Sequence, residues 1–305
     1  MKRVSLVMLT LQGILPPVPT PFTRTGDLDT TTLQRLLQRL EPEVDGFLIL
    51  GSTGEAAFLS GAERRRVVEA ARAVIPADKP LLVGTGGEAT RLVAARNEEA
   101  HELGADAALV LPPHYYTASM TEAVLRAHYL TLAEKSPLPL MLYNFPGVTT
   151  LALSPDLTAE LAQHDNIVGI KDSSGNVAAL TETMRRVPAD FQVMTGSAPT
   201  FLAALALGAQ GGILAVANVA ARPYRRLYDA FHAGDLKTAR ALQLRLNPLA
   251  QVVTTRFGIP GLKAAMKLQG LDAGYPRAPL LEFTDTGGLE PLLAQLETVT
   301  SSALR

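Results

Sequence analysis

The stretch N-I-V-G-I-K-D-S-S-G-N, residues 166–176, decides the fold. Its first part, 167–170, is a short run of apolar and small residues without the alternation of a half-exposed strand. Such a run is typical of a strand that is buried on both faces, as in a parallel sheet covered by helices. Lys171 ends the run, and turn-forming residues follow it at once. We therefore predict a buried parallel strand that places a lysine at the edge of a sheet.

Similar apolar runs recur along the chain, at intervals that leave room for one helix between successive runs. Together with a less regular first strand, the predicted strands are 14–19, 46–50, 80–83, 107–111, 139–142, 167–170, 191–194 and 212–216. Such repeated strand-helix units predict an α/β protein with a closed parallel (β/α)8 TIM barrel. We assign residues 1–235 to the barrel and residues 236–305 to an added C-terminal helical region packed on it.

Helix-start signals lie in the segments between these runs. We expect capping boxes at 60–63 and at 119–122, where a serine hydroxyl accepts from the third helical N–H and a glutamate accepts from the N–H of the serine. Ser154 followed by Pro155 indicates another helix start, because proline at the first helical position loses no hydrogen bond. The predicted helices 64–75, 90–103 and 178–186 continue as amphipathic runs.

One motif favours a different architecture, an open doubly wound sheet. The run G-T-G-G-E-A at 84–89 fits the dinucleotide fingerprint G-x-G-x-x-A, and Asp106 follows it about twenty residues later. In a dinucleotide site the acidic residue ends the second strand, whereas Asp106 precedes its strand. We interpret the match as coincidence and the glycines as a tight turn between a strand and a helix.

Composition restricts the class of function. The 305 residues are 47% hydrophobic and 19% charged, and a net charge of -1 gives no basic surface for nucleic acid. Without cysteine there is no disulfide, thiolate metal site or cysteine nucleophile, and the histidines lack metal-ligand spacing. Residues 1–12 start like a signal peptide but lack its cleavage site, so we interpret them as a lead-in to the first strand. No apolar run reaches the roughly eighteen residues that span a bilayer, and we expect a cytoplasmic protein without membrane contact.

Chemically versatile residues gather where the predicted strands end, at the mouth of the barrel. Lys171 ends a buried strand, whereas the other lysines lie at a terminus, in loops or on helices. An amine attacks a ketone only when neutral, and burial disfavours the ammonium form. Strand alternation directs Asp172 to the opposite side, away from the Lys171 amine. Tyr143 ends the neighbouring strand, where a phenol can carry protons during imine formation. The alternatives are a lysine that extends into solvent and a core tyrosine.

The turn Gly51-Ser52-Thr53-Gly54 follows the second strand. It is too short for a nucleotide-binding P-loop and lacks the lysine of that motif. Hydroxyls and backbone N–H groups in a glycine turn suit a carboxylate, because they satisfy its charge without a cation. A plain turn whose hydroxyls cap a helix is an equally good interpretation of this stretch alone.

Several motifs together resemble those of the dihydrodipicolinate synthase and N-acetylneuraminate lyase family, whose members are barrels that bind pyruvate as a Schiff base. The motifs are G-I-L-P-P-V-P-T-P-F at 13–22, G-S-T-G-E at 51–55, Y-N-F-P at 143–146, G-I-K-D-S-S-G at 169–175 and G-A-Q-G-G-I-L at 208–214. The resemblance extends in order over 13–280, and the lysine and tyrosine motifs carry most of its specificity.

The resemblance implies that Lys171 forms an imine with the keto carbon of pyruvate, without a cofactor or a metal. It also implies that Tyr143 carries protons and that Tyr115, or else Tyr116, is lent across a dimer interface to complete a hydroxyl relay. Family members are commonly homotetramers built as pairs of tight dimers, so we expect a homotetramer or a homodimer. The expected substrate-binding residues are Ser52, Thr53, Ile213, Ser173 and Gly196.

Departures from the family pattern concern the substrate. Val148 stands where the synthases carry an arginine for the carboxylate of aspartate semialdehyde, and 197–199 lacks the acidic residues of sialic acid lyases. The stretches 114–121, 205–211 and 255–263 instead resemble the 4-hydroxy-2-oxoglutarate aldolase branch. We therefore expect cleavage of 4-hydroxy-2-oxoglutarate, or of a related 2-keto-3-deoxy acid, to pyruvate. The alternatives are 4-hydroxy-tetrahydrodipicolinate (dihydrodipicolinate) synthase and, more remotely, a non-catalytic 2-oxo acid binding protein.

Overall fold

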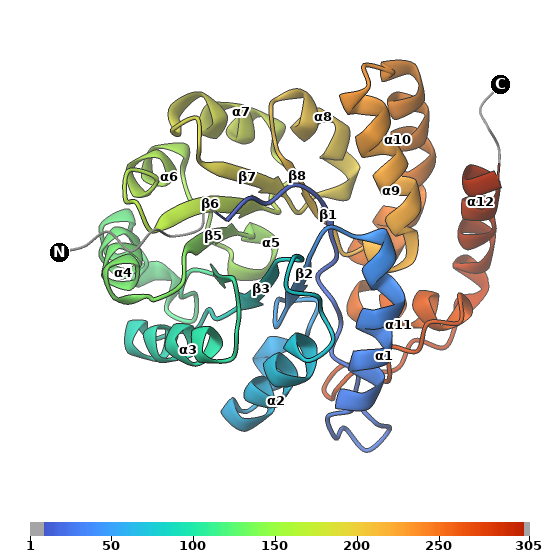
Figure 1. The fold of residues 1–305 in the computed structure, drawn as a ribbon, viewed down its shortest axis with the longest axis horizontal. Coiled ribbons are helices and arrows are strands. Elements are labelled where there is room, and N and C mark those ends of the chain that lie inside the picture. The colour runs from blue at the N-terminus through green and yellow to red at the C-terminus, as the bar shows by residue number, and fades with distance from the viewer. Residues whose placement is uncertain (1–8, 302–305) are drawn as a thin grey trace.

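A computed structural model describes residues 9–301, and the expectation for the start of the chain falls mainly on residues outside this range. One parallel sheet has the strand order β1-β8-β7-β6-β5-β4-β3-β2, with helices around it (Figure 1). The predicted (β/α)8 barrel is confirmed, and the open doubly wound sheet is wrong. The strands are β1 Gly13–Leu15, β2 Phe47–Ile49, β3 Leu81–Gly84, β4 Ala107–Val110, β5 Leu140–Asn144, β6 Ile167–Asp172, β7 Gln192–Thr195 and β8 Gly211–Ile213.

The helices alternate with the strands and then continue past the barrel (Figure 1). They are α1 Thr30–Leu40, α2 Gly61–Arg72, α3 Thr90–Glu102, α4 Glu122–Lys135, α5 Pro146–Thr149, α6 Pro155–Leu161, α7 Val177–Arg186, α8 Phe201–Ala206, α9 Ala217–His232, α10 Leu236–Ala250, α11 Gly258–Leu268 and α12 Glu290–Ser301. A π-helical segment, η5 Gln251–Arg256, joins α10 to α11. None of the described helices is long and apolar enough to cross a membrane.

Prolines shape the junction between β1 and β2. β1 is shorter than predicted, because Pro16 and Pro17 have no N–H with which to continue a regular ladder. The junction is nevertheless bonded: Leu48 N donates to Pro16 O at 3.1 Å and Val18 N donates to Leu48 O at 2.8 Å. These contacts close the barrel between its first and second strands.

Alternate strand residues form two separate cores. Leu15, Leu48 and Met194 belong to a cluster inside the barrel, whereas Ile14 and Ile49 belong to the larger cluster between the sheet and the helices. This division follows from the two-residue period of a strand, which sends successive side chains to opposite faces. Apolar residues on both faces explain why the strands read as continuous apolar runs.

The predicted helix starts are confirmed except at α4. Ser60 and Glu63 form the expected capping box on α2, and Ser154 accepts from Leu157 N at 3.1 Å at the start of α6. The box predicted at 119–122 is wrong, because Thr121 caps α4 and accepts from Val124 N. The chain makes a 3-10 turn at 117–119 before the helix begins, so the helix starts later than the serine indicated.

The glycine-rich turn after β3 is structural, as predicted. A side chain at Gly84 would place its Cβ 2.1 Å from Leu50 O, and one at Gly86 would meet Leu111 N at 2.9 Å. Asp106 accepts a hydrogen bond from Leu81 N at 2.8 Å and pairs with Arg72 at 3.2 Å. The glycines thus permit close backbone contact, and the Asp106 carboxylate is bound by Leu81 and Arg72 of the same chain.

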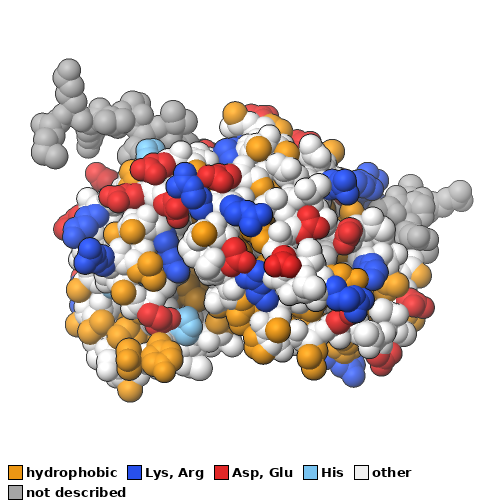
Figure 2. All heavy atoms as spheres, turned by 90° about the horizontal axis from the view of Figure 1, so that it is seen from below, with side chains coloured by type: hydrophobic (Ala, Val, Ile, Leu, Met, Phe, Trp, Pro, Cys, Tyr) orange, Lys and Arg blue, Asp and Glu red, His pale blue; other side chains and the backbone are white. Residues whose placement is uncertain are grey.

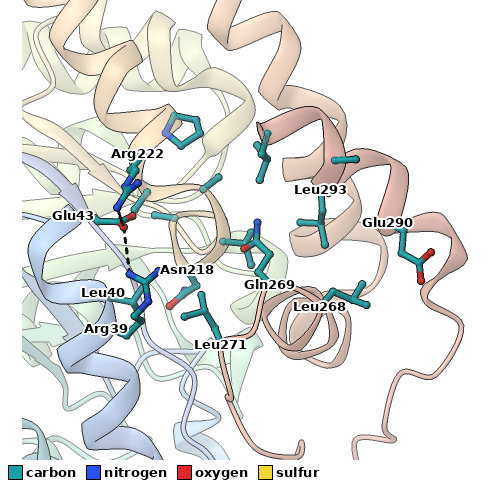
Figure 3. A pocket seen from close by; sticks show the side chains of 17 residues that line it. Arg39, Leu40, Glu43, Asn218, Arg222, Leu268, Gln269, Leu271, Glu290 and Leu293 are labelled. Atoms are coloured by element: carbon teal, nitrogen blue, oxygen red, sulfur yellow. Dashed lines mark ion pairs between the residues drawn. The ribbon is translucent and has the colours of Figure 1, made fainter. Parts of the chain in front are cut away.

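The C-terminal helices pack beside α9 and leave a groove of about 630 Å³ that α1, α9, α11 and α12 border (Figure 3). Inside it the guanidinium groups of Arg39 and Arg222 converge on Glu43, with Arg222 at 2.8 Å from the carboxylate. No lysine side chain is among the described residues that line this groove.

On the face in Figure 2, positive and negative side chains are interspersed, in keeping with the net charge of -1.

Candidate active site

Lys171 and Tyr143 meet at the end of neighbouring strands. β5 and β6 pair in parallel with Tyr143 opposite Lys171, and the amine donates a hydrogen bond to the phenol oxygen at 3.3 Å. The same amine lies 4.3 Å from the centre of the Tyr143 ring. Both side chains are buried, at 3% and 5% exposure. The lysine therefore remains inside the barrel mouth and does not extend into solvent.

Asp172 faces away from the lysine, as strand alternation predicts. Its carboxylate accepts hydrogen bonds from Asn144 Nδ2 at 2.6 Å and from Ser174 N at 3.0 Å. Asn144 in turn accepts from Leu153 N at 3.1 Å. These bonds hold the carboxylate on the helix side of the sheet, so it forms no ion pair with Lys171.

The amine faces a cavity of about 440 Å³ at the carboxyl ends of the strands. Most of the predicted site residues share this cavity although they come from different strand ends. Those that line it are Ser52, Thr53, Tyr143, Lys171, Ser173, Gly196 and Ile213. The structure thus brings together the predicted lysine, the predicted phenol and the hydroxyls of the glycine turn.

Gly196 is required by the closeness of its neighbours. A Cβ at this position would lie 1.9 Å from Ser173 Oγ and 3.0 Å from Lys171 Cε. Real Cβ atoms do not tolerate such contacts, so a larger residue would displace the serine or the lysine stem. Glycine here leaves room for both side chains on the cavity wall.

Tyr115 lies away from the cavity of its own chain. Its side chain is 76% exposed, and the ring packs edge-on against Tyr116, which is 70% exposed. The local loop is fixed because Glu88 accepts from the backbone N–H of both His114 and Tyr115. A role for Tyr115 in catalysis requires a second copy of the chain, and that role stays a prediction.

Two parts of the cavity were not predicted from the sequence. Phe145 stacks on Tyr143 with ring centres 5.7 Å apart, and the aromatic residue within Y-N-F-P was the available signal. The other part is a wall from the C-terminal region, for which the motif at 255–263 gave a family resemblance but no position. That wall contains Thr254, Thr255, Ile259 and Leu262.

The cavity has one amine and otherwise apolar or hydroxylated walls. Of the described residues that line it, Lys171 is the only lysine, arginine, histidine, aspartate or glutamate. Val148 is 45% exposed at this wall. In the part of the chain that the structure describes, no group of three histidine or carboxylate side chains is arranged to hold a metal ion. The arrangement suits nucleophilic attack by an amine on a small carbonyl compound.

Comparison with known proteins relates this geometry to one family. The model of the dihydrodipicolinate synthetase family matches residues 10–293. Curated relatives named 4-hydroxy-tetrahydrodipicolinate synthase include that of Archaeoglobus fulgidus, 35% identical over 95% of this chain and 99% of the relative. The one from Methanococcoides burtonii is 37% identical over 88% of this chain and 92% of the relative.

Solved structures agree with these matches. A Thermus thermophilus protein, whose description gives dihydrodipicolinate synthase as a proposed identity, is 44% identical with a TM-score of 0.86, over 93% of this chain and 98% of its own. Dihydrodipicolinate synthase from Bacillus anthracis is 29% identical with a TM-score of 0.87, over 98% and 100%. A monomeric dihydrodipicolinate synthase variant is 28% identical with a TM-score of 0.87, over 95% and 97%.

Proposed function

Since the chain belongs to the dihydrodipicolinate synthetase family and is a carbon–carbon lyase of the pyruvate aldolase class, we propose that Lys171 forms the imine with pyruvate. The observation that carries the proposal is the 3.3 Å contact between the buried Lys171 amine and the Tyr143 hydroxyl inside the cavity. An imine-forming amine needs a neighbouring group that moves protons, and the phenol supplies one.

The proposed reaction follows from these positions. The Lys171 nitrogen bonds to the keto carbon of pyruvate, and the carbinolamine oxygen leaves as water after Tyr143 protonates it. The iminium then withdraws electrons, so that the adjacent carbon loses a proton to give an enamine that bonds to a second carbonyl compound; cleavage is the reverse. Hydrolysis of the imine releases the product and restores the amine. Nothing in this sequence of steps uses a cofactor.

The remaining cavity residues have roles in binding. Ser52, Thr53 and the N–H groups of their turn bind the pyruvyl carboxylate, because such a turn offers several donors without a cation. Ser173, Gly196 and the backbone at Ile213 line the same space. Tyr115 from a second copy of the chain completes a hydroxyl relay to Tyr143, in a homodimer or a homotetramer.

Reductive trapping tests the imine. Incubation with pyruvate and borohydride is expected to leave one adduct per chain, on the peptide that contains Lys171. Lys171→Met should abolish the adduct, whereas Lys267→Met, which changes an exposed lysine of α11, should retain it. An adduct on another lysine, or none in the unmodified protein, would overturn the assignment.

For the second carbonyl compound, the names of the relatives support condensation of pyruvate with aspartate semialdehyde as the first candidate. The full-length alignments give this candidate its weight, because nearly the whole of each relative is matched. The expectation of 4-hydroxy-2-oxoglutarate cleavage has no such specific support from the comparisons.

Val148 favours a second candidate, retro-aldol cleavage of a small 4-hydroxy-2-oxo acid or a 2-keto-3-deoxy acid. A carboxylate brought beside this valine gains no ion pair, and a lost charged hydrogen bond costs about 1.5 to 3 kcal/mol, roughly ten- to a hundredfold in selectivity. The hydroxylated and apolar lining suits the uncharged aldehyde that is formed from a 2-keto-3-deoxy sugar acid. The glyoxylate that is formed from 4-hydroxy-2-oxoglutarate carries a carboxylate, as aspartate semialdehyde does, and gains no ion pair with Val148 either.

A direct comparison of kcat/KM decides between the two candidates. The reactions are pyruvate plus aspartate semialdehyde, cleavage of 4-hydroxy-2-oxoglutarate and cleavage of 2-keto-3-deoxy sugar acids, with one preparation. We expect Val148→Arg to raise kcat/KM for the semialdehyde by about ten- to a hundredfold, with Val148→Met as the uncharged control. A wild-type semialdehyde reaction that is fastest by more than about tenfold would remove the second candidate.

A further inference from the structure

A buried ion pair joins the turn at 51–54 to helix α11. Glu55, the residue directly after the turn, lies 2.6 Å from the Lys263 amine, and the two side chains are 0% and 2% exposed. Lys263 belongs to α11, in the C-terminal region, so the contact links segments that are far apart in the sequence. The reaction proposed above leaves this pair without a role.

The surrounding backbone also binds both members of the pair. The Lys263 amine donates to Thr20 O at 2.7 Å and to Tyr275 O at 2.6 Å, and the second oxygen of Glu55 accepts from Arg277 N at 2.8 Å. Thr20 connects the Lys263 amine to the turn, since the Thr20 hydroxyl donates to Gly54 O at 2.6 Å. Burial lowers the pKa of Lys263, and the charge of Glu55 opposes that shift.

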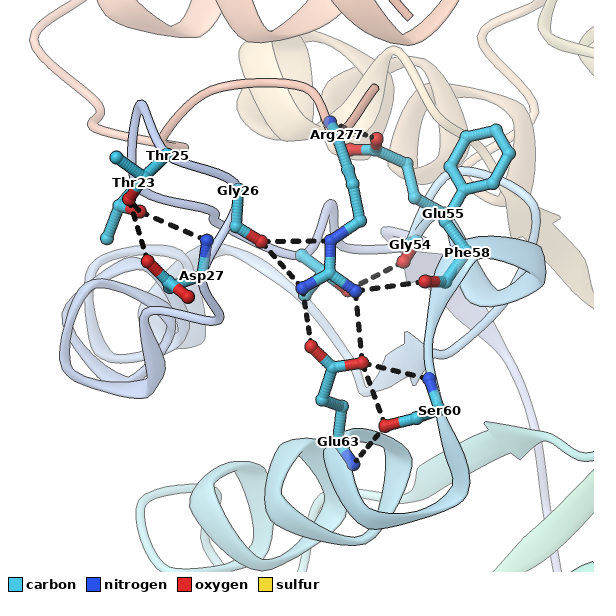
Figure 4. A network of polar contacts seen from close by, with 11 residues as sticks. Thr23, Thr25, Gly26, Asp27, Gly54, Glu55, Phe58, Ser60, Glu63 and Arg277 are labelled. Atoms are coloured by element: carbon cyan, nitrogen blue, oxygen red, sulfur yellow. Dashed lines mark hydrogen bonds and ion pairs between the residues drawn. The ribbon is translucent and has the colours of Figure 1, made fainter. Parts of the chain in front are cut away.

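Arg277 extends this network to the start of α2 (Figure 4). Its guanidinium donates to Gly26 O at 3.0 Å, to Phe58 O at 2.9 Å and to the carboxylate of Glu63 at 3.0 Å. These contacts hold the guanidinium firmly, and their acceptors, Gly26, Phe58 and Glu63, lie outside the turn at 51–54. They provide an internal comparison, because Glu63 shares the network without touching the turn.

The turn itself has an unusual backbone at both ends. Leu50 and Glu55 have φ values of 54° and 53°, in the left-handed region that residues other than glycine rarely adopt. Such residues persist where the surrounding contacts determine their conformation, and they gather at binding sites. For Glu55 the contacts in question are those of its carboxylate with Lys263 and Arg277.

Both partners of the ion pair adjoin the cavity without lining it. Glu55 stands two residues after Thr53, and Lys263 follows Leu262; Thr53 and Leu262 both line the space in front of Lys171. The pair therefore sets how the turn lies relative to the α11 wall. Buried ion pairs add little stability over apolar residues of equal size, so specific geometry is the better explanation for this one.

We propose that Glu55 and Lys263 are positioning residues that hold the Ser52-Thr53 turn in the orientation that binds the carboxylate of the 2-oxo acid. The proposal rests on the proposed imine at Lys171. Loss of the pair leaves the amine and the phenol in place but lets the turn relax. It should weaken binding of pyruvate and change its subsequent turnover little.

The test measures imine trapping by borohydride as a function of pyruvate concentration, with intact-mass spectrometry as the readout. Glu55→Gln is expected to raise the half-saturating pyruvate concentration at least tenfold while the trapped fraction at saturation stays within twofold. Pyruvamide, which carries an uncharged amide in place of the carboxylate, should be trapped equally by the wild type and the variant. A shift for pyruvamide equal to that for pyruvate would overturn the proposal.

Matched variants separate position from stability. Glu63→Gln weakens the same network through Arg277 and should lower the melting temperature without moving the pyruvate half-saturation. The double variant Glu55→Gln/Lys263→Met leaves no unpaired buried charge, so it should fold even if a single variant does not, and it should show the same selective loss for pyruvate. Glu55→Asp should recover part of the affinity.

The outcomes for the two proposals are distinguishable. If wild-type protein yields no adduct on Lys171, the imine proposal fails. If wild-type protein is trapped on Lys171 but the Glu55→Gln and double variants keep the wild-type half-saturation for pyruvate, the imine proposal stands and the positioning proposal is wrong.

Discussion

Lys171 and Tyr143 adjoin because β5 and β6 are in register at these residues, and Phe145 stacks on the phenol ring. The strand ends were predictable, since each strand is a local apolar run and the residue after it must reach the barrel mouth. The ion pair between Glu55 and Lys263 was not predictable, because no local pattern relates a turn after β2 to a lysine on α11. For a single residue, the sequence therefore predicted its position along a strand, but not its contact with a residue far away in the sequence.

Tyr143→Phe removes the phenol hydroxyl and retains the ring. We expect kcat to fall by about 10² to 10⁴, as for loss of a general acid-base group, with the melting temperature little changed because the stacking on Phe145 remains. Steady-state turnover and thermal unfolding of the same preparation check this. Turnover near that of the wild type would remove Tyr143 from the proposed mechanism.

At the scale of the element, local signals gave most helix starts, and they failed where two caps competed. Ser119 and Thr121 both precede α4, and the chain uses the threonine because the 3-10 turn occupies the serine. The first strand was predicted too long, because the apolar run continues through prolines, which have no N–H with which to extend the hydrogen-bond ladder. Sequence patterns identified the elements, and tertiary contacts fixed their ends.

Helix α4 also carries a buried histidine that makes stability depend on pH. His128 Nδ1 bonds to Thr90 Oγ1 at 2.8 Å, and burial lowers the pKa of His128 to about 4, a shift that the charge of Glu88 opposes. The unfolded chain, with a histidine pKa near 6.5, therefore binds more protons between about pH 6.5 and 4. Stability falls as the pH falls through this window, by about 2 kcal/mol at pH 5 relative to pH 7.5.

Urea unfolding at pH 7.5 and pH 5, at a fixed protein concentration, measures this loss. His128→Asn keeps an acceptor near Thr90 and does not titrate, so the loss between the two pH values should be smaller than in the wild type by about 2 kcal/mol. Glu63 makes stability depend on pH in a lower range, because Arg277 holds the pKa of the Glu63 carboxyl at about 2. The stability that Glu63 contributes is lost as the pH falls from about 4.5 to about 2. Equal losses in both proteins would show that His128 is not the source.

At the scale of the whole molecule, the number and order of strand-helix units predicted a closed barrel, and closure placed the strand ends around one cavity. Its inner wall was therefore foreseeable: Ser52, Thr53, Lys171, Gly196 and Ile213 all follow or end strands. The wall from 254–262 was not foreseeable, because helices added after the last strand obey no repeat. The proposed role of Tyr115 requires a second copy of the chain, whose position no pattern in a single sequence indicates.

The pairing of β1 with β8 has a consequence for how the protein is made. Gly13 lies opposite Gly211, so the first strand of the nascent chain waits for the last strand to leave the ribosome. At the usual rate of translation this interval is about 10 to 40 s. During that time β1 lacks one neighbour and an apolar edge is open to chaperones and to other nascent chains. The earliest moment at which the barrel can close is thus set by the order in which the ribosome delivers the strands.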